Sequence, residues 1–287
     1  MARKTGRAKA VTGKQSRILK CIAGLVAVYL VVVVGYYFGQ RSMMYFPELP
    51  DSNPVPKPAT VGLAMQEVKY KTADGLELVA WFAPPKETGG FVVVVYHGNA
   101  ANIAYRAPMA AEMMQHGYGV MMPEYRGFGG NPGTPTEEGF YADARAAIKW
   151  LEEKGYGAKR LIPYGESIGT GVAVQIATEI QPPLLVLQSP FTSFVDLANH
   201  YVPVLPAELM LKDRYDSLAK IGKVRSAVLV IHGDSDTVIP LEFAKRFFDA
   251  ANEPKQFITL PKAGHNDMYQ YGAGPRISAW MDKQLKK

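Results

Sequence analysis

Ser167 stands in the pentapeptide Gly165-Glu166-Ser167-Ile168-Gly169, which fits the pattern G-x-S-x-G. Where this pattern serves catalysis, the serine lies on a sharp turn between a strand and a helix and attacks an acyl carbon. The apolar run before Ser167 predicts a strand, and the segment after it predicts a helix. Glycine is expected at 165 and 169 because side chains there would collide with a neighbouring strand or helix. A serine that simply caps a helix has the same local sequence, so partners elsewhere must decide its role.

A nucleophilic serine needs a histidine as base and an acid that orients the histidine. The chain has five histidines, and this motif requires the chain order serine, acid, histidine. His265, in the glycine-marked loop "LPKAGHND" after the last predicted strand, is the histidine that satisfies this order. The segment "LVIHGDSDTVIP", which follows the preceding strand, offers two candidate acids, Asp234 and Asp236.

The negative charge that develops on an attacked carbonyl oxygen needs hydrogen-bond donors, usually two backbone N–H groups. The first is expected from Ile168, the residue after the nucleophile. The second is expected from the loop "HGNAAN", residues 97–102, which follows an earlier strand. Gly98 permits an unusual backbone there, so the N–H of Asn99, or that of Ala100, can point into the site. The order rule leaves His97 outside a triad, and we expect it to be a scaffold residue.

Strands and helices that alternate along the chain must position these residues. Short apolar runs predict strands at 65–72, 76–83, 91–98, 118–127, 160–167, 184–190, 226–233 and 255–261. Helical patterns fall at 104–117, 136–155, 168–180, 241–252 and 275–287, with Thr136 as an N-cap. This alternation predicts an α/β fold with a mostly parallel, eight-stranded sheet flanked by helices. In such a sheet functional residues collect at the carboxyl ends of the strands.

Several segments, taken together and in order, resemble the α/β-hydrolase superfamily and, more narrowly, its membrane-anchored Bem46-like or ABHD13/ABHD17-like serine hydrolases. They are "QRSMMYFPE", "YHGNAAN", "PEYRGFGGNPGTPTEEGFYADARAAIKWL", "YGESIGTGVAVQIA", "QSPFTSFVDLA", "VLVIHGDSDTVIP" and "GHND". The resemblance covers the chain from about residue 40 to its end. It implies that Ser167, Asp236 and His265 form a catalytic triad, with Asn99 and Ile168 as oxyanion donors.

Two features depart from that family pattern. Glu124 stands where an aspartate often precedes Tyr-Arg-Gly, which we interpret as a structural difference. No cysteine cluster follows the basic N-terminus, so the depalmitoylase role of some relatives does not carry over. The expected chemistry needs neither a metal nor another cofactor, and the lone Cys21 excludes a cysteine-based metal site and an intramolecular disulfide.

Residues 21–40, "CIAGLVAVYLVVVVGYYFGQ", contain no charged side chain and reach about 30 Å as a helix, which is one bilayer core. The alternatives are a cleaved signal peptide and a buried core helix. The apolar run is longer than a signal core and has no good cleavage site. The positive-inside rule places the N-terminus in the cytoplasm and the main body across the membrane, for which we favour a bacterial inner membrane with a periplasmic domain. Seven basic residues precede the run: Arg3, Lys4, Arg7, Lys9, Lys14, Arg17 and Lys20.

The net charge of +6 comes from this N-terminus, because the rest of the chain holds 25 basic and 26 acidic residues. Nucleic acid is therefore not an expected partner. We divide the chain into a basic cytoplasmic tail (1–20), a transmembrane anchor (21–40), a proline-rich extended linker (41–60) and an α/β-hydrolase catalytic domain (61–287).

The sequence thus predicts a single-pass membrane serine hydrolase that cleaves esters or thioesters of small-molecule or lipid-like acyl substrates. A peptidase of the same fold, an acyl transferase and a non-catalytic membrane-binding module remain as alternatives. Between the strands that end near Ser189 and begin near Ser226 lie 36 residues, which predict a small cap and an open site. Within it, residues 199–210 are apolar enough to be a lid, a lipid-facing lip or a core helix.

Overall fold

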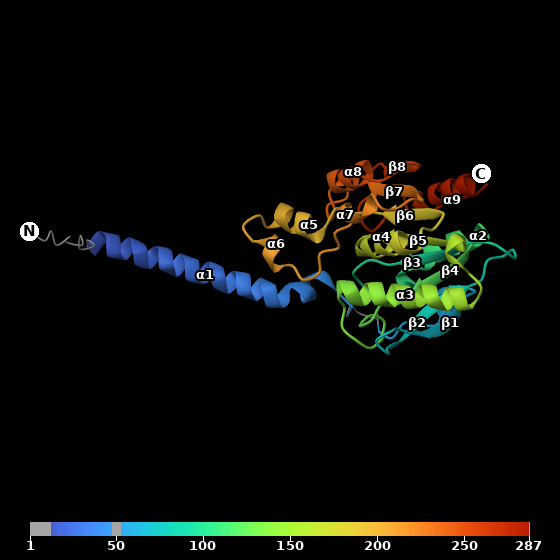
Figure 1. Cartoon of the computed structure of the whole chain (residues 1–287), viewed down its shortest axis with the longest axis horizontal. Helices are drawn as coiled ribbons and strands as arrows, with labels where there is room; N and C mark the ends of the chain where they lie inside the picture. Colours follow the sequence, from blue (N-terminus) through green and yellow to red (C-terminus); the bar gives the residue numbers. More distant parts are fainter. Residues whose placement is uncertain (1–12, 48–52, 287) are drawn as a thin grey trace, which may run out of the picture. The chain divides into compact units, whose positions relative to one another are not determined.

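The computed structural model describes residues 13–47 and 53–286, which divide into two units between Gln40 and Arg41. The first unit consists of helix α1 (Gly13–Met44) up to Gln40, and the second holds the remainder of the chain (Figure 1). Each unit has its own internal contacts, and the second contains the expected sheet and all five candidate site residues.

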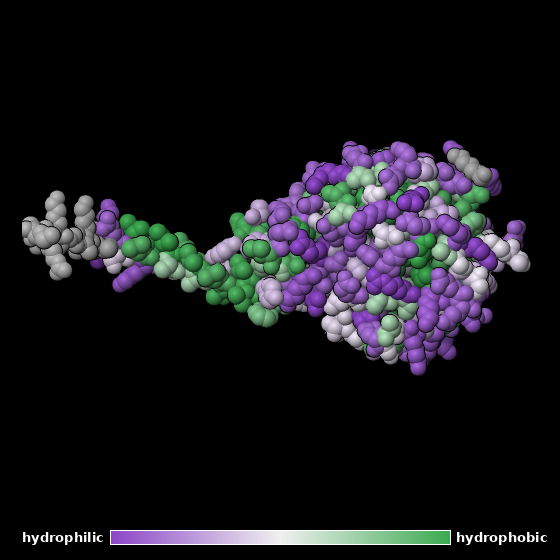
Figure 2. All heavy atoms as spheres, viewed as in Figure 1, coloured by the Kyte–Doolittle hydropathy of each residue, from purple (hydrophilic) through white to green (hydrophobic). Residues whose placement is uncertain are grey.

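Helix α1 is apolar along most of its length, as Figure 2 shows, and none of its most apolar 18-residue window is buried. Residues Lys14–Met44 are long and apolar enough to cross a membrane or to act as a signal sequence, and no other helix among the described residues is. At 1.5 Å per residue this stretch reaches about 46 Å, so the predicted span at 21–40 lies within it. Residues 1–12 of the predicted basic tail lie outside the described residues.

The second unit is built on an eight-stranded sheet with the order β1-β2-β4-β3-β5-β6-β7-β8. Strands β1, β2 and β4 pair antiparallel, and β4, β3 and the strands from β5 onward pair parallel. The predicted mostly parallel sheet of eight strands is therefore confirmed. The strands are β1 (Gln66–Lys71), β2 (Glu77–Ala83), β3 (Val92–Tyr96), β4 (Gly119–Pro123), β5 (Leu161–Glu166), β6 (Leu184–Gln188), β7 (Ala227–Gly233) and β8 (Lys255–Leu260).

Helices cover both faces of this sheet and enclose two apolar cores. Helices α3 (Glu137–Glu153), α4 (Ile168–Ile180) and α8 (Leu241–Asp249) contribute to one core, and α2 (Ala107–Gln115) and α9 (Ala273–Leu285) to the other. The central strands are buried on both faces, which explains their continuous apolar runs, such as "VVVVY" in β3. Thr136 caps α3 as predicted, because its side chain accepts a hydrogen bond from the N–H of Gly139.

The direction of strand addition reverses at β3, because the chain first adds β4 on one side and then β5 on the other. Strands β3 and β5 are parallel neighbours, with Tyr96 opposite Gly165 at their carboxyl ends. Loops that leave such a switch point diverge and leave room for a ligand. The loops that contain Asn99 and Ser167 therefore start side by side.

Residues 41–60, predicted to be an extended linker, pack against the catalytic unit in their described parts. The compact second unit begins at Arg41, not at residue 61. Tyr45 is buried, the N–H of Val55 donates to the carbonyl of Gly129, and the short 3-10 helix η1 (Pro58–Val61) closes the segment. Aromatic and apolar side chains among the prolines explain this packing, because they gain more from burial than from extension into water. Residues 48–52 lie outside the described residues.

The predicted cap between β6 and β7 is present and small. It contains the short helices α5 (Phe194–Tyr201), α6 (Ala207–Met210) and α7 (Leu218–Ile221). Ala207 and Met210 are buried, but Val204 and Leu209 are 71% and 85% exposed. Residues 199–210 therefore do not form a core helix, and Figure 2 shows hydrophobic atoms over this α5–α6 region.

Candidate active site

Ser167 occupies the tight turn between β5 and α4 with φ 53° and ψ −120°. A non-glycine residue at such a positive φ is strained, and it persists only when the surrounding structure enforces it. Here the N–H of Ser167 donates to the carbonyl of Gln188 on β6, and its carbonyl accepts from the N–H of Thr170 on α4. The turn is thus held from both sides, and the side chain does not cap the helix.

The glycines on either side are required by backbone that passes close to them. A Cβ at Gly165 would lie 2.5 Å from Cα of Thr170, which is backbone of α4. A Cβ at Gly169 would overlap the carbonyl oxygen of Tyr96 and lie 2.7 Å from that of His97, at the end of β3. The close approach of α4 to β5 and β3 therefore excludes any side chain at either position.

Ser167, His265 and Asp236 lie in one hydrogen-bonded row. The Nε2 atom of His265 is 3.0 Å from Oγ of Ser167, and its Nδ1 atom is 2.7 Å from Oδ2 of Asp236. The three side chains follow β5, β8 and β7, all at the carboxyl edge of the sheet. The structure thus brings together the three residues that the resemblance implies, while Asp234 accepts from the N–H of Lys262 in a neighbouring turn.

Asp236 is buried, and every contact around it favours the carboxylate form. Its Oδ1 accepts from the N–H groups of Val238 and Ile239, and its Oδ2 accepts from the hydroxyl of Ser189 as well as facing His265. Burial alone would raise the pKa of Asp236, but the hydrogen bond and charge of His265 outweigh it and hold the pKa below its usual range. The acid therefore stays ionised at neutral pH and can stabilise a positive charge on His265.

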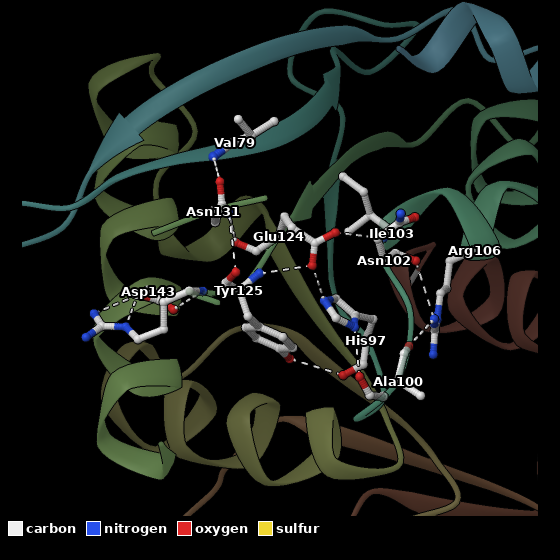
Figure 3. A network of polar contacts seen from close by, with 12 residues as sticks. Val79, His97, Ala100, Asn102, Ile103, Arg106, Glu124, Tyr125, Asn131 and Asp143 are labelled. Atoms are coloured by element: carbon white, nitrogen blue, oxygen red, sulfur yellow. Dashed lines mark hydrogen bonds and ion pairs between the residues drawn. The ribbon is translucent and has the colours of Figure 1, made fainter. Parts of the chain in front are cut away.

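Glu124 organises the loop after β3, as Figure 3 shows. Its Oε1 lies 2.9 Å from Nε2 of His97, and its Oε2 accepts from the N–H of Ile103. The Nδ1 atom of the His97 ring lies 2.8 Å from the carbonyl oxygen of Gly98. His97 is thus a buried scaffold residue, as expected, and Glu124 is a support of the loop at residues 97–103.

Arg106 and Glu166 form a second support that the sequence did not reveal. The guanidinium donates through Nε and Nη2 to both carboxylate oxygens of Glu166, at 2.9 and 3.0 Å. Its Nη1 donates to the carbonyl of Ala100 and, at 3.4 Å, to that of Asn102. Burial raises the pKa of Glu166, but the charge of Arg106 outweighs it, so the pKa is lowered and the ion pair persists. Arg106 thus ties the loop after β3 to the residue that precedes the serine.

The two expected oxyanion donors border Ser167. Ile168 is the first residue of α4, and among the described residues no acceptor takes its N–H or that of Asn99. The loop passes close to the serine, because a Cβ at Gly98 would lie only 3.7 Å from Cβ of Ser167. Neither N–H group is therefore taken up by a backbone acceptor of the described residues, as an oxyanion donor requires.

A cavity of about 680 Å³ adjoins this site. Its lining includes Glu166 and Asn266, the residues next to Ser167 and His265 in the chain. The lining is mixed, with apolar surface from Met109 and Pro108 beside the carboxylates of Glu112 and Asp267 and the Arg106–Glu166 pair. Within the described part of the chain, no group of three or more His, Cys, Asp or Glu side chains is placed to hold a metal ion.

Known proteins resemble this chain in sequence or in fold. Residues 90–212 match the family described as Serine aminopeptidase, S33. The Mycobacterium tuberculosis protein Rv2307c is 39% identical over 256 residues, which cover 88% of this chain and 90% of that protein. The alpha/beta hydrolase domain-containing protein WAV2 of Arabidopsis thaliana is 27% identical over 274 residues and 87% of each chain. The Pyrococcus furiosus esterase Pf2001 superposes with a TM-score of 0.67 at 20% identity, covering 84% of this chain and 98% of that one.

The chain belongs to the α/β-hydrolase superfamily. In this α/β-hydrolase, the support that the sequence did not reveal is the Arg106–Glu166 pair, which holds the loop after β3. Arg106 falls in a segment expected to be an ordinary helix, and its partner Glu166 lies 60 residues away. A buried charge next to Ser167 was the one available signal, because Glu166 needs a cationic partner at the end of a buried strand.

Proposed function

We propose that this α/β-hydrolase is a membrane-anchored serine hydrolase that cleaves carboxylic ester or thioester bonds. The observation that carries the proposal is the unbroken row from Asp236 through His265 to Oγ of Ser167. A serine held in a strained turn, next to a histidine whose second nitrogen faces a buried carboxylate, matches the requirements of nucleophilic acyl transfer.

In the first half of the reaction, Oγ of Ser167 attacks the carbonyl carbon of the substrate as His265 takes the hydroxyl proton. The N–H groups of Ile168 and Asn99 donate to the oxygen of the tetrahedral intermediate. Asp236 holds the histidine in the required tautomer and stabilises the imidazolium. His265 then returns the proton to the leaving alcohol or thiol, and an acyl-enzyme remains on Ser167.

In the second half, His265 takes a proton from a water molecule, whose oxygen attacks the acyl carbon. The bond between this carbon and Oγ of Ser167 then breaks, His265 returns the proton to Oγ, and the acid leaves. An alcohol in place of the water would make the protein a transferase. The chemistry is completed by side chains and backbone N–H groups of this chain and draws on neither a metal nor a cofactor.

The membrane part of the proposal rests on α1 and on the cap. We propose that α1 is an uncleaved anchor with its N-terminus in the cytoplasm and that the catalytic unit lies on the opposite, extracytoplasmic side, in a bacterial inner membrane. The exposed apolar side chains of Val204 and Leu209 support a lipid-like acyl substrate, because a cap that presents them gains from contact with a bilayer surface.

Labelling with a fluorophosphonate probe tests the catalytic part. The parent protein should label and hydrolyse short-chain p-nitrophenyl esters, and Ser167→Ala should do neither. Ser226→Ala is the matched control. Ser226 directly precedes β7, at the amino end of the strand and away from the site, and its hydroxyl donates to the carbonyl of Pro182. A folded parent that stays unlabelled, or a Ser167→Ala protein that labels like the parent, would leave the non-catalytic membrane-binding module as the better account.

Alkaline carbonate extraction tests the anchor. An uncleaved transmembrane helix keeps the protein in the pellet, and detergent releases it. Mass spectrometry of the N-terminus shows at which residue the mature chain begins. A protein released by carbonate, or a mature chain that begins after residue 40, would contradict the anchor and favour a signal peptide.

A serine peptidase of the aminopeptidase type is the second candidate. Two carboxylates in the cavity, those of Glu112 and Asp267, favour it, because an aminopeptidase must accept a substrate ammonium group. The test compares esters and amino-acyl amides in parallel on the parent and on Glu112→Gln. Peptidase activity would appear as amide cleavage that Glu112→Gln weakens, while neutral esters are cleaved as before.

A further inference from the structure

The segment that leads from α1 into the catalytic unit lies against the loop that carries Asn99. We call residues 41–47 the entry segment. The N–H of Phe46 donates to the carbonyl of Asn99 at 2.8 Å, and the N–H of Ala101 donates back to the carbonyl of Phe46 at 3.4 Å. These two bonds form a parallel β-bridge between Phe46 and Ala100. The entry segment thus adds a short piece of strand beside the candidate oxyanion loop.

The side chain of Asn99 makes a third bond to the same segment. Its Nδ2 donates to the carbonyl of Met44 at 2.9 Å. The carbonyl and the side chain of Asn99 are therefore both engaged by the entry segment. These bonds hold Cα of Asn99 and the Asn99–Ala100 peptide, and so restrict rotation about φ of Asn99. The Gly98–Asn99 peptide, which carries the N–H, is held at that end by the entry segment and at its carbonyl by Nδ1 of His97. Glu124 and Arg106 hold the later part of the loop, at Ile103 and at Ala100 and Asn102.

The entry segment is itself held firmly by the base of the cap. Arg41 donates through Nε and Nη2 to the carboxylate of Asp213, at 2.7 and 3.1 Å. The buried hydroxyls of Tyr45 and Tyr215 lie 3.0 Å apart, and the Tyr45 ring packs edge-on against Phe140 of α3. An ion pair, a buried hydrogen bond and an aromatic contact thus fix the position of the entry segment, which in turn bonds to Asn99.

We propose that the entry segment is a positioning element of the active site, which acts by orienting the N–H of Asn99 toward the oxyanion. The inference rests on the proposed function, since it needs Asn99 to serve as an oxyanion donor. An oxyanion donor contributes to the transition state and little to the bound substrate, provided that it is oriented in advance. Loss of the contacts made by the entry segment should therefore lower kcat and leave KM nearly unchanged.

The test uses the full-length protein in detergent micelles with p-nitrophenyl butyrate. Asn99→Ala retains the donor N–H but removes the bond to Met44. Asn252→Ala is the matched control, because the Asn252 amide also donates to backbone carbonyls, those of Gly222 and Val224, away from the site. We expect kcat for Asn99→Ala to be about ten- to a hundredfold below that of Asn252→Ala, with KM within about twofold, since removal of a whole oxyanion donor costs about 10²–10³.

A second pair of variants changes the backbone bond. Phe46→Pro removes the N–H that donates to Asn99, and Phe46→Ala retains it, so that kcat should be at least several-fold lower for Phe46→Pro. A trifluoromethyl ketone, which forms a tetrahedral adduct on serine, should bind Asn99→Ala more weakly by the same factor as kcat/KM falls. A role in folding alone would lower the active fraction, and with it the apparent kcat, but the active fraction would bind the trifluoromethyl ketone as tightly as the parent does.

Amide hydrogen exchange of residues 98–102 gives a readout that does not depend on turnover. Exchange should rise in Asn99→Ala and in Phe46→Pro, but not in Asn252→Ala. Equal kcat in Asn99→Ala and Asn252→Ala, or unchanged exchange at 98–102, would overturn the inference. A parent protein that exchanges as expected but neither hydrolyses esters nor labels would instead contradict the proposed function.

Discussion

Nε2 of His265 lies 3.0 Å from Oγ of Ser167, although 98 residues separate them in the chain. The two residues follow β5 and β8, which are separated in the sheet by β6 and β7. The loop after β8 therefore extends over the carboxyl ends of β7 and β6 to place His265 beside Ser167. Asp236, in the loop after β7, contacts Nδ1, the ring nitrogen that does not face Ser167. Because β7 lies between β5 and β8 in the sheet, the loop after β7 brings Asp236 close to the His265 ring. Asp236 can therefore both orient the histidine and stabilise its charged form.

Asp236→Asn should abolish most of the activity while the protein stays folded. An amide at this position offers an N–H to Nδ1 and favours the wrong tautomer of His265, so Nε2 can no longer take the proton from Ser167. The equivalent change in a related constellation costs about 10⁴ in kcat, and we expect a loss of about 10³–10⁴ here. The rate of ester hydrolysis measures the activity, and circular dichroism shows whether the variant is folded.

Asp234→Asn is the matched control for that variant. The carboxylate of Asp234 accepts from the N–H of Lys262 and the hydroxyl of Ser235, and it makes no contact with His265. Activity should stay within about threefold of the parent, since this group supports only a turn. If Asp234→Asn were the variant that lost activity, the assignment of the acid would have to move by two residues.

Gly169→Ala should destabilise the catalytic unit severely. The new methyl group would overlap the carbonyl of Tyr96, which is backbone and cannot rotate away. Overpacking of this kind costs about 1–3 kcal/mol or more, and a backbone clash lies at the upper end. Thermal unfolding should show a drop of several degrees, whereas Gly157→Ala, with open space around the site, should unfold like the parent. Equal melting temperatures for the two variants would contradict the tight approach of α4 to β3.

Arg106→Met should lower the free energy of unfolding by about 3–5 kcal/mol, because it leaves the carboxylate of Glu166 buried and unpaired. Adding Glu166→Met should recover part of that loss. The comparison is Arg145→Met, which breaks a pair with Glu179 in which the two side chains are 45% and 30% exposed. That exposed pair should contribute less than about 1 kcal/mol. Denaturant titration of the parent, the two single variants and the double variant measures their free energies of unfolding. Similar losses of stability in Arg106→Met and Arg145→Met would contradict a buried pair at Arg106.

His232 should make the stability of the catalytic unit depend on pH. Its ring is fully buried beside Asp236 and donates through Nε2 to the carbonyl of Ile239, and burial lowers its pKa. Because the pKa is lower in the folded state, the unfolded state takes up the proton first. Stability is therefore complete above about pH 6.5 and falls as the pH decreases through the folded pKa.

Denaturant titrations of the parent and of His232→Gln between pH 7.5 and 5 check this direction. The variant should be less stable at pH 7.5 but should lose less stability on acidification, because it has no ring to protonate. The slope from one proton cannot exceed about 1.4 kcal/mol per pH unit. Parallel decline in the two proteins would show that other groups control the acid sensitivity.

The sequence by itself determined the order of the elements and the candidates for the site. Continuous apolar runs mark strands buried on both faces, so the eight strands, and with them the parallel sheet, could be predicted to within a few residues. Ser167 and His265 could be located because each follows a strand, and local patterns indicate where strands end. Asp236 needed the resemblance, since Asp234 lies in the same turn.

Only the tertiary structure decided how the loop beside Ser167 is held. The contacts from Arg106 to Glu166, from Glu124 to His97 and from Met44 and Phe46 to Asn99 join segments that are distant in the chain. No local periodicity encodes such pairs, because a hydrogen bond across the sheet depends on strand order and not on sequence spacing. The same reason explains residues 41–47. They fall within the predicted proline-rich linker 41–60, but in the folded chain they contact Asn99, Phe140, Asp213 and Tyr215.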